Sequence, residues 1–194
     1  MKKLLIILSV FTVFFVGCQN ADDSNITGPV TGDGGIDISS TNETPAPSVA
    51  DTIDGSQGGT ITLACDTTIN GKVRTVHVNL HIQKGAFDGV KVITVIASFD
   101  SISLSFFPHM IFNDSDLVRL NAHFTGINLN SLAVIHGHDQ DTTSSKYSFC
   151  YFGNDNSYEI IKEDSISVSN ASSQIGVKNA QLKHFSRYCW ATRQ

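Results

Sequence analysis

In the stretch RTVHVNLHI, residues Arg74–Ile82, polar and apolar side chains alternate from Thr75 onward. A β-strand points successive side chains to opposite faces of its sheet, so a period of two residues indicates a strand with one buried face. Val76, Val78, Leu80 and Ile82 would then face a core, while the polar residues between them would face solvent. This stretch therefore predicts a half-buried strand and points to a β-sheet fold.

The same period recurs along most of the chain after residue 50. In Leu117–Phe124, the residues Val118, Leu120, Ala122 and Phe124 would face inward. Further strands are predicted at Gly59–Ala64, Val90–Ala97, Ile102–Phe107, Leu132–His136, Tyr147–Phe152, Tyr158–Lys162, Ser165–Ser169 and Phe185–Ala191. Turn signals separate them at Asn70-Gly71, Asp88-Gly89, Asn113-Asp114 and Gly153–Asn156. Many short strands without a long helix predict an all-β fold, an antiparallel β-sandwich or barrel, and we expect the sandwich.

The composition limits the classes of protein to which the chain can belong. Of its 194 residues, 41% are hydrophobic and 16% are charged, which is too apolar a composition for a wholly disordered chain. The length suits one domain with a tail. The formal net charge of -5 argues against a nucleic-acid-binding protein, because such a protein needs a clustered basic surface to neutralise phosphates.

The first residues have the pattern of a bacterial lipoprotein signal. Lys2 and Lys3 precede the uncharged run Leu4–Gly17, whose 14 residues fall short of the roughly 20 that a helix needs to cross a bilayer. The run ends in FVGC, which resembles a lipobox, where a small residue precedes the cysteine that is acylated. We expect residues 1–17 to be a signal peptide and Cys18 to carry palmitate-type chains that anchor the protein. An ordinary cleaved signal peptide is the alternative.

Residues 18–50 have the composition of a tether. Between Gln19 and Ala50 the chain has no Lys, no Arg and no aromatic residue, and it holds three of the four prolines. Such a stretch buries too little apolar surface to offset its conformational entropy, so we expect a disordered linker before a folded body over residues 51–194. The lipid anchor would hold this body in the bacterial cell envelope, on the outer membrane, facing the periplasm or the cell surface.

Four segments of the body resemble the ZU-five-type domain, the β-sandwich module of zonula occludens proteins, netrin receptors and ankyrins, in its bacterial cell-envelope form. They are Gly58–Leu63, Leu80–Phe87, Phe106–Phe112 and Leu182–Tyr188. The most specific part is HFSRY at His184–Tyr188. The resemblance spans about Gly58 to Ala191 and implies a β-sandwich that serves interaction or structure rather than catalysis.

The same segments carry expectations about the backbone. Gly85 would supply a positive φ after a strand, and Pro108 would stand at a strand edge or end because proline has no N–H for the ladder. Alternation along the last strand would put His184, Ser186, Tyr188 and Trp190 on one face, and Phe185, Arg187, Cys189 and Ala191 on the other.

The resemblance also implies one chemical hypothesis. Some animal relatives of this domain cut their own chain between the Phe and the Ser of a His-Phe-Ser motif. Here Ser186 would be the nucleophile, Phe185 would provide the scissile carbonyl and His184 would assist. The other interpretation is that these residues begin the last strand and pack, and we favour it.

Seven histidines make metal binding a second hypothesis. His77 and His81 share a strand face but would lie about 13 Å apart, at about 3.3 Å per residue, so they cannot share one ion. His136 and His138 would lie about 6.6 Å apart on one face, followed by a polar loop. A metal- or glycan-binding module that uses His136–Asp141 is therefore an alternative function, and ordinary exposed loop histidines are the simpler interpretation.

The cysteines other than Cys18 are Cys65, Cys150 and Cys189. Cys150 and Cys189 lie in aromatic-rich predicted strands and are a candidate disulfide, while small buried thiols are the alternative. No nucleophile motif, phosphate-binding loop or paired-carboxylate pattern points to an enzyme. The sequence thus predicts a non-enzymatic, cofactor-free module with an unknown protein or glycan partner.

Overall fold

The alternating stretches of the sequence form two facing β-sheets in a computed structural model, which describes residues 46–135, 146–153 and 157–193. The strands are β1 (Ser48–Asp54), β2 (Gly59–Ile69), β3 (Lys72–Ile82), β4 (Val90–Ser98), β5 (Ser103–Ile111), β6 (Val118–Thr125), β7 (Ala133–Ile135), β8 (Tyr147–Phe152), β9 (Tyr158–Ile160), β10 (Ser165–Ser169), β11 (Gln174–Gln181) and β12 (His184–Arg193). Two single 3-10 turns, η1 (Ser115–Leu117) and η2 (Leu129–Ser131), are the helical elements of these ranges. Within them, no helix has the length and apolar character needed to cross a membrane.

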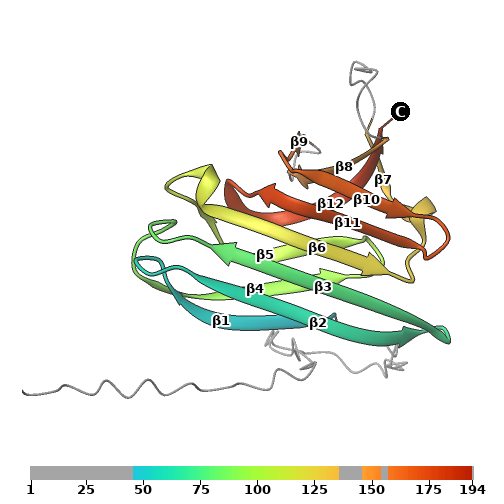
Figure 1. Cartoon of the computed structure of the whole chain (residues 1–194), viewed down its shortest axis with the longest axis horizontal. Helices are drawn as coiled ribbons and strands as arrows, with labels where there is room; N and C mark the ends of the chain where they lie inside the picture. The colour runs from blue at the N-terminus through green and yellow to red at the C-terminus, as the bar shows by residue number, and fades with distance from the viewer. Residues whose placement is uncertain (1–45, 136–145, 154–156, 194) are drawn as a thin grey trace, which may run out of the picture.

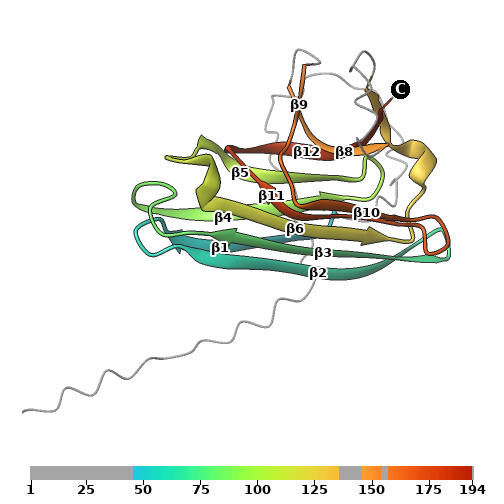
Figure 2. The ribbon, with the colours of Figure 1, turned by 45° about the horizontal axis from the view of Figure 1, so that its top comes forward.

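Each sheet combines segments that lie far apart in the sequence. One sheet has seven strands in the order β1-β4-β5-β12-β8-β9, with β7 paired in parallel to β12. The other has five strands in the order β10-β11-β6-β3-β2, all antiparallel. In Figure 1 the five-stranded sheet lies in front of β4 and β5, and Figure 2 shows the two layers from another side. The expected antiparallel β-sandwich is thus confirmed at the level of an all-β, two-sheet fold.

The core fills the space between the sheets and is rich in aromatic side chains. The largest fully buried residues are Trp190, Tyr188, Phe106, Phe124, Phe149 and Phe185. The inward sets predicted for Arg74–Ile82 and Leu117–Phe124 are confirmed, because each of those side chains is at most 5% exposed. Polar side chains between them are left on the outer face of the five-stranded sheet.

Two of the predicted turn features also appear. Asn70 and Gly71 have φ values of 51° and 73° and join β2 to β3, whose flanking residues Ile69 and Lys72 are paired. Two successive positive φ values suit a two-residue hairpin that follows the twist of the strands. Gly85 has the expected positive φ, at 86°.

The sequence analysis missed β1 and β11. β1 begins at Ser48, so the expected boundary at residue 51 falls inside a strand. Only Val49 and Ile53 of β1 are buried, which gives too few apolar positions for a visible period. In β11 a register shift between Val177 and Ala180 interrupts the alternation.

A second register shift corrects the expectation for the last strand. The pairing of β12 with β5 shifts between Phe185 and Arg187, so Phe185 and Tyr188 both face the main core. Residues 106–109 of β5 lie opposite Ser186 alone, and the alternation of β12 is interrupted there, because neither Ser186 nor Arg187 is buried. Pro108 lies inside β5 rather than at its end, but it falls within this shift, where no ladder bond is required of it.

Candidate functional site

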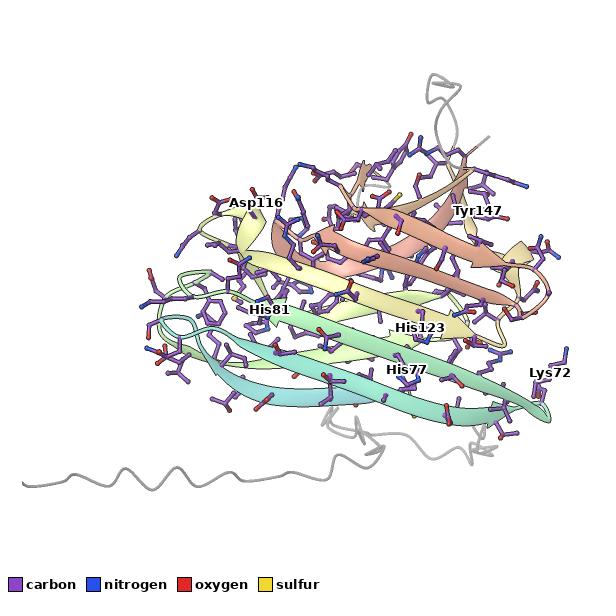
Figure 3. The ribbon with its side chains drawn as sticks, in the orientation of Figure 1. Lys72, His77, His81, Asp116, His123 and Tyr147 are labelled. Carbon is purple, nitrogen blue, oxygen red and sulfur yellow. The ribbon has the colours of Figure 1, made fainter. Side chains whose placement is uncertain are left out.

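The outer face of the five-stranded sheet gathers neutral polar side chains around two histidines. His77 of β3 and His123 of β6 are paired directly across the sheet, and their rings stack with centroids 4.8 Å apart and planes 19° from parallel. Figure 3 shows the two side chains next to each other on the front of the sheet, with His81 farther along β3. Facing positions on antiparallel strands bring side chains within contact distance, so the register itself creates this pair.

A shallow hollow of about 480 Å³ opens beside the two rings. Its polar lining includes Thr62, Asn79, Asn121, Ser167, Gln174 and Lys178, from all five strands of the sheet. Gly176 also lines the hollow, and a Cβ built there would lie 3.0 Å from Ser167 Oγ, from the His123 Cβ and from the carbonyl oxygen of Ala122. A larger residue at this position would therefore crowd His123 and Ser167 beside the hollow.

The neighbouring positions along the same two strands repeat the polar character. Asn79 and Asn121 face each other two residues from the histidine pair, and Asn79 Nδ2 donates a hydrogen bond of 3.3 Å to Thr62 Oγ1. Farther along, His81 faces Arg119 on one side and contacts Thr60, with 3.2 Å between Nδ1 and Oγ1. On this outer face, His77 is therefore paired with another histidine, whereas His81 is paired with the positively charged Arg119.

Burial lowers the pKa of His123, one of the two stacked histidines. The pKa of His123 lies below its ordinary value of 6.5, first because burial penalises its charged form and second because His77 is close. The His123 imidazole is therefore neutral at neutral pH and has a lone pair available on one ring nitrogen.

The His-Phe-Ser motif lies at the start of β12 and is engaged in packing. The Tyr188 hydroxyl donates a 2.6 Å hydrogen bond to the carbonyl oxygen of His184, and the His184 ring packs edge-on against Tyr151 with centroids 4.6 Å apart. Phe185 is buried between Phe106 and other core rings.

Nothing in the local backbone suggests a strained scissile bond. The Phe185–Ser186 peptide is trans and neither residue has a positive φ. The pKa of His184 is lowered, mainly by burial, and Glu159 opposes that effect. In the described part of the chain, no hydrogen bond joins the His184 ring to Ser186. These contacts favour the packing interpretation, and self-cleavage stays an untested hypothesis.

Cys150 of β8 and Cys189 of β12 are direct cross-strand partners. Facing residues of antiparallel strands have Cα atoms about 4.5–5.5 Å apart, within the range of about 4.4–6.8 Å that a disulfide needs. Both are thiols in the structure. Burial raises the pKa of Cys150 to about 12 and that of Cys189 to about 11, so neither is a ready nucleophile. The register permits the predicted disulfide, which stays a prediction.

Three of the predicted site residues lie outside the described residues: Cys18, His136 and His138. Among the residues that are described, no group of three or more His, Cys, Asp or Glu side chains is placed to hold a metal ion. The sequence analysis considered His77 with His81 but missed His77 with His123. The alternation shows that both point outward, but it does not show the register between their strands, in which the two histidines are 46 residues apart.

Comparisons with known proteins identify no relative of this chain. A scan against protein-family models finds no match, and searches of the curated proteins and of the solved structures find none either.

Proposed function

We propose that the protein is a lipid-anchored component of a bacterial cell envelope, whose β-sandwich is a non-enzymatic binding module. Acylated Cys18 would hold it to the membrane, and residues 18–50 would be the tether. The binding surface would be the outer face of the five-stranded sheet, around the hollow between Thr62 and Ser167.

The chemistry of the hollow supports an uncharged, hydroxyl-rich ligand, such as a polysaccharide. Its described lining combines hydroxyl, amide and imidazole groups, and Lys178 is the one residue there with a permanent charge. Amide and hydroxyl groups both donate and accept hydrogen bonds, as sugar hydroxyls do. Protein-binding patches are instead enriched in aromatic residues, Met and Arg, which this lining lacks among its described residues. The observation that carries the proposal is this neutral polar hollow.

The test is direct binding to purified neutral polysaccharides, measured by calorimetry with the full chain purified in detergent. Ser167→Trp places a large ring beside Gly176 and should weaken binding at least about tenfold, or about 1.4 kcal/mol. Thr52→Trp, on exposed β1 of the other sheet, is the matched control and should bind as the unaltered protein does. No binding by the unaltered protein, or undiminished binding by Ser167→Trp, would exclude a glycan at this face.

The anchor needs a separate test. Replacing Cys18 by Ala should move the protein from the membrane fraction to the aqueous fraction when expressing cells are broken and centrifuged. A variant that stays with the membrane would show that acylation of Cys18 does not hold the protein there.

A protein partner is the second candidate, and it is favoured by the other sheet. Four large apolar side chains of β4 and β5 are exposed, namely Val90 (65%), Val92 (60%), Phe107 (40%) and Ile111 (82%). Exposed apolar side chains that gather on one face often mark contact surfaces. Val92→Glu should then disrupt co-purification of the partner, whereas Ser167→Trp should not.

A further inference from the structure

We propose that His77 and His123 form a two-histidine binding site for a transition-metal ion, with Cu²⁺ the preferred ion, on the outer face of the five-stranded sheet. The proposal goes beyond the binding function above, because it requires neither a lipid anchor nor a glycan. It depends on the cross-strand pairing of the two residues and on the open space beside them.

The backbone holds the two imidazoles at a separation from which they can reach one ion. Metal–imidazole bonds are about 2.0–2.1 Å long, so two nitrogens on the same ion lie roughly 3 Å apart. The ring centroids are 4.8 Å apart and the planes nearly parallel, so a tilt of the two rings toward each other brings one nitrogen of each to that spacing. Both residues lie inside continuous paired strands, so we expect the backbone to stay in place while the side chains turn.

The surroundings leave room for the ion and for further ligands. His77 is exposed, His123 is half-buried, and the hollow begins beside them. Gly176, the partner of His123 on β11, also lines the hollow next to the two rings. Water or the amide and hydroxyl oxygens of the hollow could occupy the remaining positions of the ion.

The number and type of ligands determine which metal is expected. Imidazole suits Cu, Ni and Zn, and for a given nitrogen and oxygen site the affinity for divalent ions peaks at Cu²⁺. Structural zinc sites use four protein ligands, and the described residues offer no third His, Cys, Asp or Glu here. A site of two nitrogens completed by water or other oxygens matches the tetragonal preference of Cu²⁺.

His81 provides a matched control on the same strand and the same face. It lies four residues from His77, and its partner across the sheet is Arg119 rather than a histidine. A cation next to an imidazole opposes the binding of a second cation. A single exposed histidine in this environment should therefore contribute little to Cu²⁺ binding.

The experiment is a titration of the full chain, purified in detergent and freed of metal, with Cu²⁺ at pH 7.5. Calorimetry should give one ion per chain, and electron paramagnetic resonance should show two nitrogen ligands. His77→Ala and His123→Ala should each weaken binding at least about tenfold. His81→Ala should bind as the unaltered protein does. Circular dichroism checks that each variant is folded.

A further control separates this site from the histidines of the 136–145 segment. The double variant His136→Ala and His138→Ala should still bind one Cu²⁺ with two nitrogen ligands. The proposal is overturned if the unaltered protein binds no Cu²⁺, if either His77→Ala or His123→Ala binds it undiminished, or if the double variant loses the site. Replacing each histidine by Gln instead of Ala repeats the test in case an Ala variant fails to fold.

Discussion

The two sheets present different chemistry to solvent, although their strands share the same alternating pattern. Apart from Val73, which is 63% exposed near the start of β3, outward positions of β3 and β6 carry His, Asn, Thr and Arg, and the stacked His77–His123 pair lies among them. Outward positions of β4 and β5 carry Val92, Phe107 and Ile111, with the His109 ring stacked on Phe107 at 5.0 Å. A period of two residues thus predicts which side chains face solvent. The types of those residues then determine what kind of ligand or partner each face can bind.

The difference suggests separate tasks for the two faces. Exposing a polar face to water costs little free energy, so such a face can bind small hydrophilic ligands and also remain without a ligand. An apolar face is less favourable in water and gains free energy, at about 25 cal/mol per Å² of apolar surface, when another surface covers it.

The largest expected effect is the loss of a side chain on which both sheets depend. Trp190 of β12 packs against Phe149 of its own sheet at 4.8 Å and against Phe124 of the other sheet at 5.4 Å. Trp190→Ala should lower the free energy of unfolding by about 3–5 kcal/mol. Urea denaturation measures this, with Val90→Ala as the exposed control. A loss below about 1 kcal/mol would mean that the two sheets do not depend on this ring.

The candidate disulfide should have the next largest effect. If Cys150 and Cys189 bond, oxidised protein should be lighter by two hydrogens, and its reduction should cost about 2–4 kcal/mol of stability. Because the thiolate is the reacting form and both thiol pKa values are raised, the bond should form slowly. Intact mass and denaturation with and without reductant decide this, and an unchanged mass would leave both as thiols.

Removing the Tyr188 hydroxyl should have a smaller effect. Tyr188→Phe deletes the hydrogen bond to the His184 carbonyl and should cost about 1–2 kcal/mol, since the partner is then left half-buried without its donor. Tyr151→Phe is the control from the same aromatic cluster. Intact-mass measurement of both variants also tests the His-Phe-Ser hypothesis, because a fragment beginning at Ser186 would show self-cleavage.

The stability of the seven-stranded sheet should depend weakly on pH through His184. Its folded-state pKa lies below the unfolded value of 6.5, so stability should be constant above that pH and fall as pH decreases from about 6.5 toward the folded pKa. The fall should be small, because solvent screens a half-buried group. Glu159, Lys183 and His109 face this ring and set its remaining electrostatics.

Comparing His184→Asn with the unaltered protein isolates that contribution. The variant should show a flatter dependence of the unfolding free energy on pH between 7.5 and 5.5 in urea denaturation. Identical slopes for the two proteins would assign the pH dependence to other groups.

The smallest effect is expected on the exposed apolar face. Ile111 is 82% exposed, so Ile111→Lys should change the free energy of unfolding by no more than about 0.5 kcal/mol. Thermal unfolding measures this. A loss above 1 kcal/mol would show that this side chain is covered in the folded protein in solution.

Local patterns predicted the strands well where the alternation was regular. β8 and β10 begin and end at the predicted residues, and the Asn70-Gly71 hairpin follows from residues that tolerate positive φ. β11 escaped prediction because Asn179 takes a positive φ at its register shift, which breaks the period.

The candidate site could be predicted only in part, for a different physical reason. That His77 and His123 point outward is a local property of each strand. That they meet is a property of the register between β3 and β6, which is set by packing of the whole core. Gly176 lines the hollow and lies in β11. Because β11 was not predicted from the sequence, the place of Gly176 beside His123 could not be predicted either.

The position of β12 also has a consequence for the order in which the molecule can assemble. Among the strands of the described residues this one comes last in sequence, yet it pairs with β5, β8 and β7 in the interior of the seven-stranded sheet. Until β12 is available, β5 and β8 have no partner between them and the core lacks Phe185, Tyr188 and Trp190. Because a polypeptide is made from its first residue onward, the sandwich can close only after β12 has been made, and a chain interrupted before residue 184 would remain an open, unfinished sheet.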